Sequence, residues 1–146
     1  MPPYTVSQVR WPEHSAELLA VRRAVFVEEQ GVAETLELDG RDAGAWHLLA
    51  CDGAGLPIGC VRLLVDAHIG RLAVLRRARR RGIGRELLVA AVRLARKLGM
   101  GDLYLHAQTH ARGFYEASGF IAEGEEFPEA GIAHVLMRLP ADNAPT

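Results

Sequence analysis

Residues 69–107 read IGRLAVLRRARRRGIGRELLVAAVRLARKLGMGDLYLHA, and the hydrophobic period changes twice along them. Residues 69–75 are rich in strand formers, whereas residues 82–98 place apolar side chains at helical spacing with arginines outside the stripe. Residues 103–107 return to strand composition. A strand, a helix and a second strand in this order predict a parallel pair joined by a right-handed crossover.

The segments on either side of this unit continue the mixed pattern. A strand, a helix and two further strands precede it, and a short helix and two closing strands follow it. We therefore predict an α/β (α+β) fold, with a mixed central sheet of about seven strands and helices on both faces. Residues 1–140 are expected to form a single domain, followed by a tail at 141–146. The flanking elements are expected at residues 4–10, 13–29, 46–51, 58–65, 111–118, 120–125 and 132–139, with an acidic loop at 31–44.

The composition limits the class of protein. Of 146 residues, 49% are hydrophobic and 24% are charged, which excludes a disordered chain and a membrane-spanning one. The two cysteines, Cys51 and Cys60, are too few for a disulfide scaffold or a zinc ribbon, and no metal site is expected. The N-terminus shows no secretory signal, so a cytoplasmic location is expected. A net charge of −1 disfavours a globally basic nucleic-acid binder, and we expect neither nucleic acid nor membrane as a partner.

A basic turn between the strand at 69–75 and the helix at 82–98 is the most informative local feature. Six arginines fall within residues 76–85, and Gly82 and Gly84 open the helix. The first backbone N–H groups of a helix lack intrahelical partners and carry the positive end of the helix dipole. Glycine leaves room for a ligand to approach them, so the turn predicts a phosphate-binding site. It is neither a dinucleotide fingerprint, because Leu87 stands where a third glycine would be, nor a P-loop.

Two motifs resemble those of the GNAT superfamily of acyl-CoA-dependent N-acetyltransferases. The signature Gln/Arg-x-x-Gly-x-Gly/Ala corresponds to RRRGIG at residues 79–84, and Asn-x-x-Ala-x-x-x-Tyr corresponds to QTHARGFY at residues 108–115. The chain is most similar to the ElaA-like branch, in which glutamine suits position 108. The stretches that carry this closer resemblance are FVEEQ at 26–30, LDGRD at 38–42, AQTH at 107–110 and GIAH at 131–134.

The resemblance implies acetyl-CoA as co-substrate and an acyl-CoA N-acyltransferase (GNAT) fold. The pyrophosphate would bind the backbone N–H groups of residues 81–85, and the pantetheine arm would follow a bulged strand at Leu72, Ala73 and Val74. The residues expected to contact the co-substrate are Leu72, Ala73, Val74, Arg79, Arg80, Arg81, Gly82, Ile83, Gly84, Arg85, Gln108, Ala111, Phe114 and Tyr115.

The resemblance also implies direct transfer of the acetyl group to an amine in a ternary complex. The backbone N–H of Val74 would stabilise the carbonyl oxygen, and Tyr115 would protonate the leaving thiolate. The candidates for the general base are Glu29, Asp39, Asp42, His47, His110 and His134. Glu29 is the first choice, because it lies at the end of the first helix, which borders the acceptor cleft in this family.

The acceptor itself is expected to be a small-molecule or peptide amine. Acidic residues on the acceptor side would attract a cationic amine, although such a charge run is more often a solvated face. Dimers are common in this family, so a homodimer is among the expectations. The residues expected on the acceptor side are Glu29, Asp39, Asp42, His47, His110 and His134.

Two alternatives to an N-acetyltransferase remain at this point. The cluster from Arg76 to Arg85 also suits a module that binds nucleic acid or polyphosphate, whose affinity would fall steeply with salt. A domain with the same fold could instead bind acyl-CoA as a sensor without turnover. Separately, the alternative for Tyr115 is a packed aromatic residue on a short helix, and the alternative for each histidine is a structural role.

Overall fold

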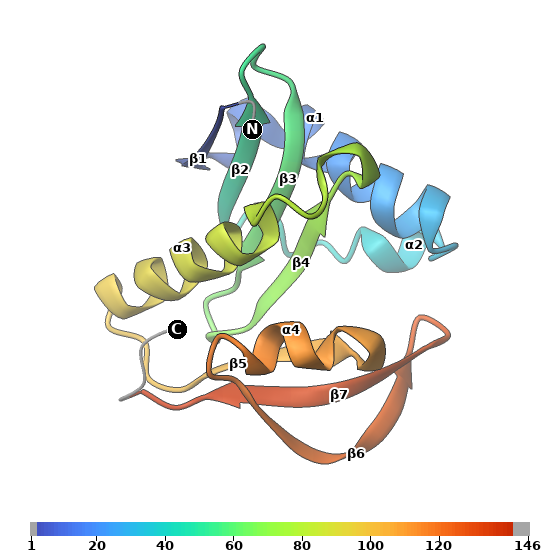
Figure 1. Ribbon diagram of the computed structural model, residues 1–146, viewed down its shortest axis with the longest axis vertical. Coiled ribbons are helices and arrows are strands. Elements are labelled where there is room, and N and C mark those ends of the chain that lie inside the picture. The colour runs from blue at the N-terminus through green and yellow to red at the C-terminus, as the bar shows by residue number, and fades with distance from the viewer. Residues whose placement is uncertain (1–2, 142–146) are drawn as a thin grey trace.

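The structure is a computed structural model that describes residues 3–141 (Figure 1). Residues 1–2 and 142–146 lie outside the described residues, and so does all of the expected tail except Ala141. In chain order, the elements are β1 (Tyr4–Val9), α1 (Trp11–Arg22), η1 (Arg23–Glu29), α2 (Glu34–Glu37), β2 (Trp46–Asp52), β3 (Pro57–Leu63), β4 (Ile69–Val74), η2 (Arg76–Ala78), α3 (Ile83–Lys97), β5 (Leu103–Gln108), η3 (Thr109–Ala111), α4 (Arg112–Glu116), β6 (Ile121–Glu129) and β7 (Ile132–Leu139). Here η1 is a π-helical segment, and η2 and η3 are 3-10 turns.

In the described part of the chain, seven strands form two antiparallel sheets that meet at a narrow junction. The first sheet has the order β1-β2-β3-β4 and the second has the order β5-β7-β6. They are joined by a parallel bridge between His68, just ahead of β4, and Tyr104 in β5. Beyond that bridge β4 and β5 diverge, as Figure 1 shows. The fold class and the strand number predicted from the sequence are therefore confirmed, with the crossover pair reduced to a short contact.

A bulge in β4 accompanies this divergence. Cys60 pairs with Ala73 and Arg62 pairs with Gly70, so β4 has one more residue than β3 across this interval. Arg71, inside the interval, has a φ of 51°, which is unusual for a residue other than glycine. A bulge bends its strand and increases its twist, which carries the end of β4 away from β5. The bulge that the resemblance implied is therefore present.

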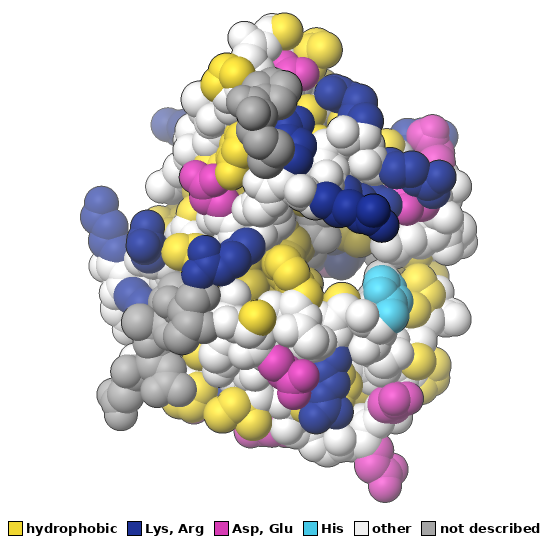
Figure 2. All heavy atoms as spheres, in the orientation of Figure 1, with side chains coloured by type: hydrophobic (Ala, Val, Ile, Leu, Met, Phe, Trp, Pro, Cys, Tyr) yellow, Lys and Arg dark blue, Asp and Glu magenta, His cyan; other side chains and the backbone are white. Residues whose placement is uncertain are grey.

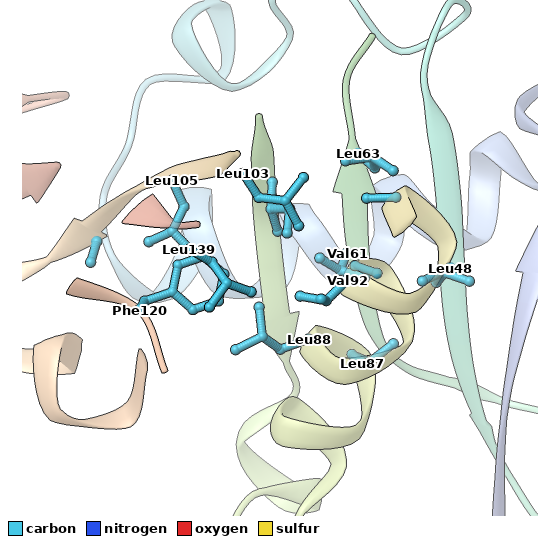
Figure 3. Close-up of a cluster of buried hydrophobic side chains, with 14 of the residues drawn as sticks. Leu48, Val61, Leu63, Leu87, Leu88, Val92, Leu103, Leu105, Phe120 and Leu139 are labelled. Carbon is cyan, nitrogen blue, oxygen red and sulfur yellow. The ribbon is translucent and has the colours of Figure 1, made fainter. Parts of the chain in front are cut away.

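Hydrophobic cores cover both faces of the first sheet, because side chains along a strand alternate between them. Leu48 and Val61 lie on one face with α3, whereas Leu49 and Cys60 lie on the other with α1. Figure 3 shows the larger core, where Leu87 and Leu88 of α3 lie among leucines of both sheets. We call the basic turn between β4 and the start of α3 the phosphate turn. Since α3 packs against both sheets, the phosphate turn is held at the point where the sheets separate. Across residues 3–141, none of the helices is both long enough and apolar enough to cross a bilayer.

The helix expected at 13–29 is divided into an α-helix and a π-helical segment. In η1 the backbone widens, and the N–H of Gln30 donates to the carbonyl of Val25, five residues back, at 3.1 Å. Such segments occur frequently at functional sites. The wider turn here places the side chains of Phe26, Glu29 and Gln30 along a cavity between the two sheets.

The hairpin between β6 and β7 also differs from expectation, because β6 runs to Glu129 instead of ending near residue 125. Ala130 and Gly131, with φ of 52° and 76°, form a tight turn. Pro128 is accommodated because β6 is an edge strand. The longer strand brings Glu129 opposite Ile132 at the edge of the cavity.

Candidate active site

A cavity of about 680 Å³ lies between the diverging strands, lined by residues of η1, α2, β3, β4, β5, η3, α4, β6 and β7. Figure 2 shows a hollow on this face, with basic side chains beside it and a histidine on its opposite rim. Among the predicted site residues, those that line the cavity are Glu29, Asp39, Leu72, Ala73, Val74, Arg79, Gln108, His110, Ala111, Tyr115 and His134.

The phosphate turn adjoins this cavity. Gly82 caps α3 in a left-handed conformation with a φ of 79°, and a Cβ there would meet no heavy atom within 4 Å. The helical hydrogen bonds begin with the N–H of Glu86 donating to the carbonyl of Gly82 at 3.0 Å. The N–H groups of Ile83 and Gly84 therefore lie in the unpaired first turn of the helix. This geometry is suited to a phosphate group, and phosphate binding at this turn stays a prediction.

Gly84 also has a packing role at this turn. A Cβ at Gly84 would lie 3.6 Å from Phe114 Cζ and 3.6 Å from Val74 Cγ2, so α3 begins close against both residues. Phe114 is part of the turn's surroundings and lies outside the cavity lining. The turn thus joins the end of β4 to α4, which carries Tyr115.

Arg79, expected to contact phosphate, has its N–H groups directed at protein atoms instead. Its Nη1 and Nη2 donate to the two carboxylate oxygens of Glu29 at 2.7 and 2.6 Å, and its Nε donates to the carbonyl of Val74 at 3.0 Å. A bidentate pair of this kind fixes geometry. The first residue of the signature therefore ties the phosphate turn to η1 and to the end of β4. A contact of Arg79 with phosphate stays a prediction.

Glu29 is correspondingly a poor proton acceptor. The Arg79 guanidinium, bonded to both of its oxygens, lowers the pKa of Glu29 to about 2, and Arg76 lies 3.4 Å away. A general base working near neutral pH needs a pKa closer to that pH. The structure therefore does not support the expectation that Glu29 is the general base.

The backbone of Val74 faces the opening between the sheets. The next residue, Leu75, donates its N–H to Ile58 of the neighbouring strand at 2.9 Å. Because successive backbone groups of a strand point to opposite edges, the N–H of Val74 points away from β3 and toward the cavity. This orientation is the one required of a donor to a thioester carbonyl.

Tyr115 lines the same cavity from α4. Its ring packs edge-on against Phe114 and Phe120, with centroids 5.0 and 6.2 Å away. Burial raises the pKa of Tyr115 to about 12, so its hydroxyl stays protonated at neutral pH. The residue is thus in the protonation state that a general acid needs.

Gln108 spans the cavity mouth. Its amide nitrogen donates to the Oε1 of Gln30 at 2.8 Å, and its amide oxygen lies 2.7 Å from Nε2 of the exposed His110. Gln30 follows η1 and Gln108 ends β5, so this hydrogen bond connects the two halves of the molecule.

One wall of the cavity is built from charges that neutralise one another. The Nη atoms of Arg62 lie 2.9 and 2.8 Å from the carboxylate of Asp39, and Nε of Arg71 lies 2.6 Å from Glu37. These arginines lower the pKa of Asp39, against the effect of its partial burial. We call this set the ionic wall: Glu37, Asp39, Arg62 and Arg71. It is not the negative field that the sequence suggested.

Two predicted acceptor residues lie behind this wall, outside the cavity lining. Asp42 is buried and accepts hydrogen bonds from Arg22 at 2.7 Å and from Arg62 at 3.1 Å. His47 is buried, stacks on Trp11, and has its Nε2 2.9 Å from the carbonyl of Asp42. Burial lowers the pKa of His47, which keeps its ring neutral. The expected acceptor contacts are therefore corrected for both residues, because packing and ion pairs engage their side chains.

The facing wall is formed by the second sheet and carries polar groups. His106 Nδ1 lies 2.8 Å from Oε1 of Glu129, and His134 Nδ1 lies 2.7 Å from the carbonyl of Ile132. We call this set the histidine wall: His106, Gln108, Glu129 and His134. His106 and Glu129 were not among the predicted site residues, although His106 falls opposite the buried Leu103 and Leu105 in strand alternation. Within the described ranges, no group of three or more His, Cys, Asp or Glu side chains has an arrangement suited to a metal ion.

Comparison with known proteins identifies the family. The family model for the acetyltransferase (GNAT) domain matches residues 10–141. A Bacillus subtilis protein named as an acetyltransferase is 38% identical over 130 residues, which cover 85% of this chain and 88% of that protein. An acyl-CoA N-acyltransferase structure from Pseudomonas aeruginosa has a TM-score of 0.79 at 31% identity, covering 95% of this chain and 99% of that chain.

The crystal structure of Escherichia coli ElaA has a TM-score of 0.83 at 27% identity and covers 92% of this chain and 99% of that chain. The resemblance to the GNAT superfamily and to ElaA is therefore confirmed. The fold of this family uses acyl-CoA as co-substrate. With the phosphate turn, the bulged β4 and the cavity in place, the chain belongs to the GNAT family of acetyltransferases.

Proposed function

We propose that this enzyme transfers the acetyl group of acetyl-CoA to a primary amine by direct attack while both substrates are bound. The observation that carries the proposal is one cavity that adjoins the α3 phosphate turn and is lined by both Val74 and Tyr115. A polyphosphate-binding surface alone would need the turn and its arginines, but not the cavity.

The phosphate end of acetyl-CoA would bind at the start of α3. The N–H groups of Ile83 and Gly84 would hold the pyrophosphate, since open space at Gly82 leaves the approach clear. Arg76, Arg77 and Arg80 are exposed near this turn and would meet further phosphate oxygens.

The thioester would lie between Val74 and Tyr115. The N–H of Val74 would donate to the carbonyl oxygen as negative charge develops there; one such donor is worth about 3 kcal/mol of barrier. Tyr115 would give its proton to the departing sulfur, which its protonated state permits. Cys60 is buried and its pKa is raised by desolvation, so a covalent acyl-cysteine route has no activated thiol here.

The acceptor would enter between the ionic wall and the histidine wall. Because the charges of the ionic wall are already paired, we do not infer strong attraction of a polycation. The proposed acceptor is a small-molecule or peptide primary amine whose recognition depends on the shape of the cavity and on hydrogen bonds.

A panel of amines incubated with acetyl-CoA, scored by release of free CoA thiol, tests this proposal. We expect turnover with at least one amine, and weaker binding of 3′-dephospho-CoA than of CoA in titration calorimetry. CoA binding without thiol release for every amine would favour a sensor. Salt-sensitive binding of polyphosphate or nucleic acid with no CoA binding would overturn the proposal.

A further inference from the structure

We propose that His134 is the group that removes the proton from the acceptor amine, with Glu129 carrying that proton to solvent. The inference rests on the proposed function, because it assigns the general base of the same site. It replaces Glu29, whose two carboxylate oxygens are held by Arg79.

His134 lies on the cavity face of the second sheet. In β7 it pairs with Gln108 of β5 on one side and with Phe127 of β6 on the other, so these side chains share a face. The adjacent Val135 belongs to the hydrophobic core on the opposite face. His134 lines the cavity with only 8% of its side chain exposed, so a bound acceptor would meet it away from bulk water.

The hydrogen bond at Nδ1 determines which nitrogen can act as a base. Nδ1 lies 2.7 Å from the carbonyl oxygen of Ile132, and a carbonyl only accepts hydrogen bonds. Nδ1 therefore carries the proton in the neutral ring, and the lone pair is on Nε2. A ring oriented in this way by a backbone carbonyl is held in one tautomer, ready to accept a proton at Nε2.

Glu129 provides the route by which the proton leaves. Its Oε2 lies 3.7 Å from His134 Nε2, and its Oε1 accepts a hydrogen bond from His106 Nδ1 at 2.8 Å. The Glu129 side chain is 47% exposed, so it connects the buried ring to solvent. The carboxylate also stabilises the positive charge that His134 acquires.

The other titratable groups near this wall are less suitable. His68 stacks on Tyr104 and lies 4.9 Å from His106, and burial lowers its pKa to about 4. His110 is exposed and its Nε2 is engaged by Gln108. The groups facing His134 are thus Glu129 and Phe127 from β6, and Gln108 from β5, with His106 reached through Glu129.

The protons balance as follows. Nε2 of His134 takes one proton from the ammonium group, and the neutral amine nitrogen then forms the N–C bond to the acetyl carbon. The C–S bond breaks, and Tyr115 gives its proton to the sulfur. The second amine proton returns to Tyr115, and the first leaves through Glu129 as the one proton released per turnover.

His134→Asn tests the inference, because the asparagine amide can still donate to Ile132 but cannot act as a base. At about pH 7 we expect kcat to fall by roughly 10²-fold or more. At about pH 10, where much of the acceptor is already neutral in solution, the loss should shrink. CoA affinity by titration calorimetry and the melting temperature should stay close to those of wild type.

Two further variants accompany His134→Asn: Glu129→Gln tests the route to solvent, and His14→Asn is a control. Glu129→Gln removes the outlet but keeps the base, so we expect a smaller loss of about tenfold with the same recovery at high pH. His14 lies on α1, paired with Glu17 at 3.0 Å, and its substitution controls for loss of any histidine. Wild-type turnover with an unaffected His134→Asn rate would overturn this inference alone. Absence of wild-type turnover with every amine would overturn the proposed function as well.

Discussion

The two walls of the cavity use their polar groups in opposite ways. In the ionic wall, each arginine is bonded to at least one carboxylate of α2 or of the loop that follows it. In the histidine wall, His106 and His134 each use Nδ1 in a hydrogen bond, to Glu129 and to the carbonyl of Ile132, and no arginine of the ionic wall pairs with them. The first arrangement fixes a shape, whereas the second leaves groups able to exchange protons.

This difference shows that abundance of charge does not identify the chemistry of a site. The acidic residues at 34–42 stand out in the sequence, but their main partners are Arg22, Arg62 and Arg71. Buried ion pairs of this kind need complete pairing, because an unpaired buried charge is strongly destabilising. The acidic segment therefore mainly builds the wall and holds the bulge at Arg71.

Breaking the pairing behind the ionic wall should have the largest effect. Arg22 is buried and bonded to Glu37 at 2.9 Å and to Asp42 at 2.7 Å. Arg22→Met would leave two buried carboxylates without this partner, and we expect a loss of about 3–5 kcal/mol in the free energy of unfolding. Urea unfolding at neutral pH measures it.

The exposed pair of Arg23 and Glu34 is the matched control, since its members lie at 2.8 Å but more than half exposed. Arg23→Met should change the free energy of unfolding by at most about 1 kcal/mol. Equal losses for Arg22→Met and Arg23→Met would contradict the role given to the buried network.

Substitution of Tyr115, which is not part of the ionic wall, should reduce kcat more than it reduces the free energy of unfolding. Tyr115→Phe removes the proton donor but keeps the ring that packs against Phe114 and Phe120. We expect kcat to fall by about 10²-fold, with CoA affinity retained. Steady-state kinetics together with titration calorimetry separate the two quantities, and an unchanged kcat would remove Tyr115 as the acid.

The stability of the junction between the two sheets, where His68 lies, should fall in mild acid. Because burial lowers the pKa of His68 from 6.5 to about 4, the folded ring stays neutral while the unfolded chain takes up a proton. Stability from this residue is complete above pH 6.5 and is lost as the pH falls toward 4. His68→Phe keeps the stacking surface on Tyr104 and cannot protonate, so its unfolding midpoint in urea should fall less than that of wild type over this range.

The ion pair of Glu29 with Arg79 should affect stability only in stronger acid, and its effect on the free energy of unfolding should be the smallest. The folded pKa of Glu29 is about 2 against an ordinary 4.5, so its contribution is present above pH 4.5 and is lost as the pH falls toward 2. Solvent reaches this pair, which reduces the effect. Glu29→Gln should flatten the acid dependence of the urea midpoint below pH 4.5, whereas Glu13→Gln at the surface should leave it unchanged.

Sequence periodicity predicted the strands, the crossover helix and the phosphate turn, because each of these depends on local spacing. The alternation of Leu103 and Leu105 and the stripe of the helix at 82–98 are visible without knowledge of the partners. Tyr115 and Val74 came from the family resemblance, and the cavity is lined by both of them.

Pairings between segments distant in the sequence cannot be predicted from local spacing. The bidentate bond of Arg79 joins residues 50 positions apart, and the place of Glu129 beside His106 depends on how far β6 extends. The π-helical segment η1 was predicted only as part of a continuous helix, since the spacing of apolar residues over 13–29 does not distinguish the two helix types. Tertiary contacts, rather than local propensity, therefore determine which of the candidate side chains is free to act as a base.

The hydrogen bond between Gln30 and Gln108 has a consequence for substrate entry. It connects the segment after η1 to the end of β5, where the two sheets share no strand ladder. A pantetheine amide that approaches Gln108 must compete with Gln30 for the same nitrogen. Exchange of one such bond for another is nearly neutral in free energy, so breaking the Gln30–Gln108 hydrogen bond would cost little if a pantetheine carbonyl took its place.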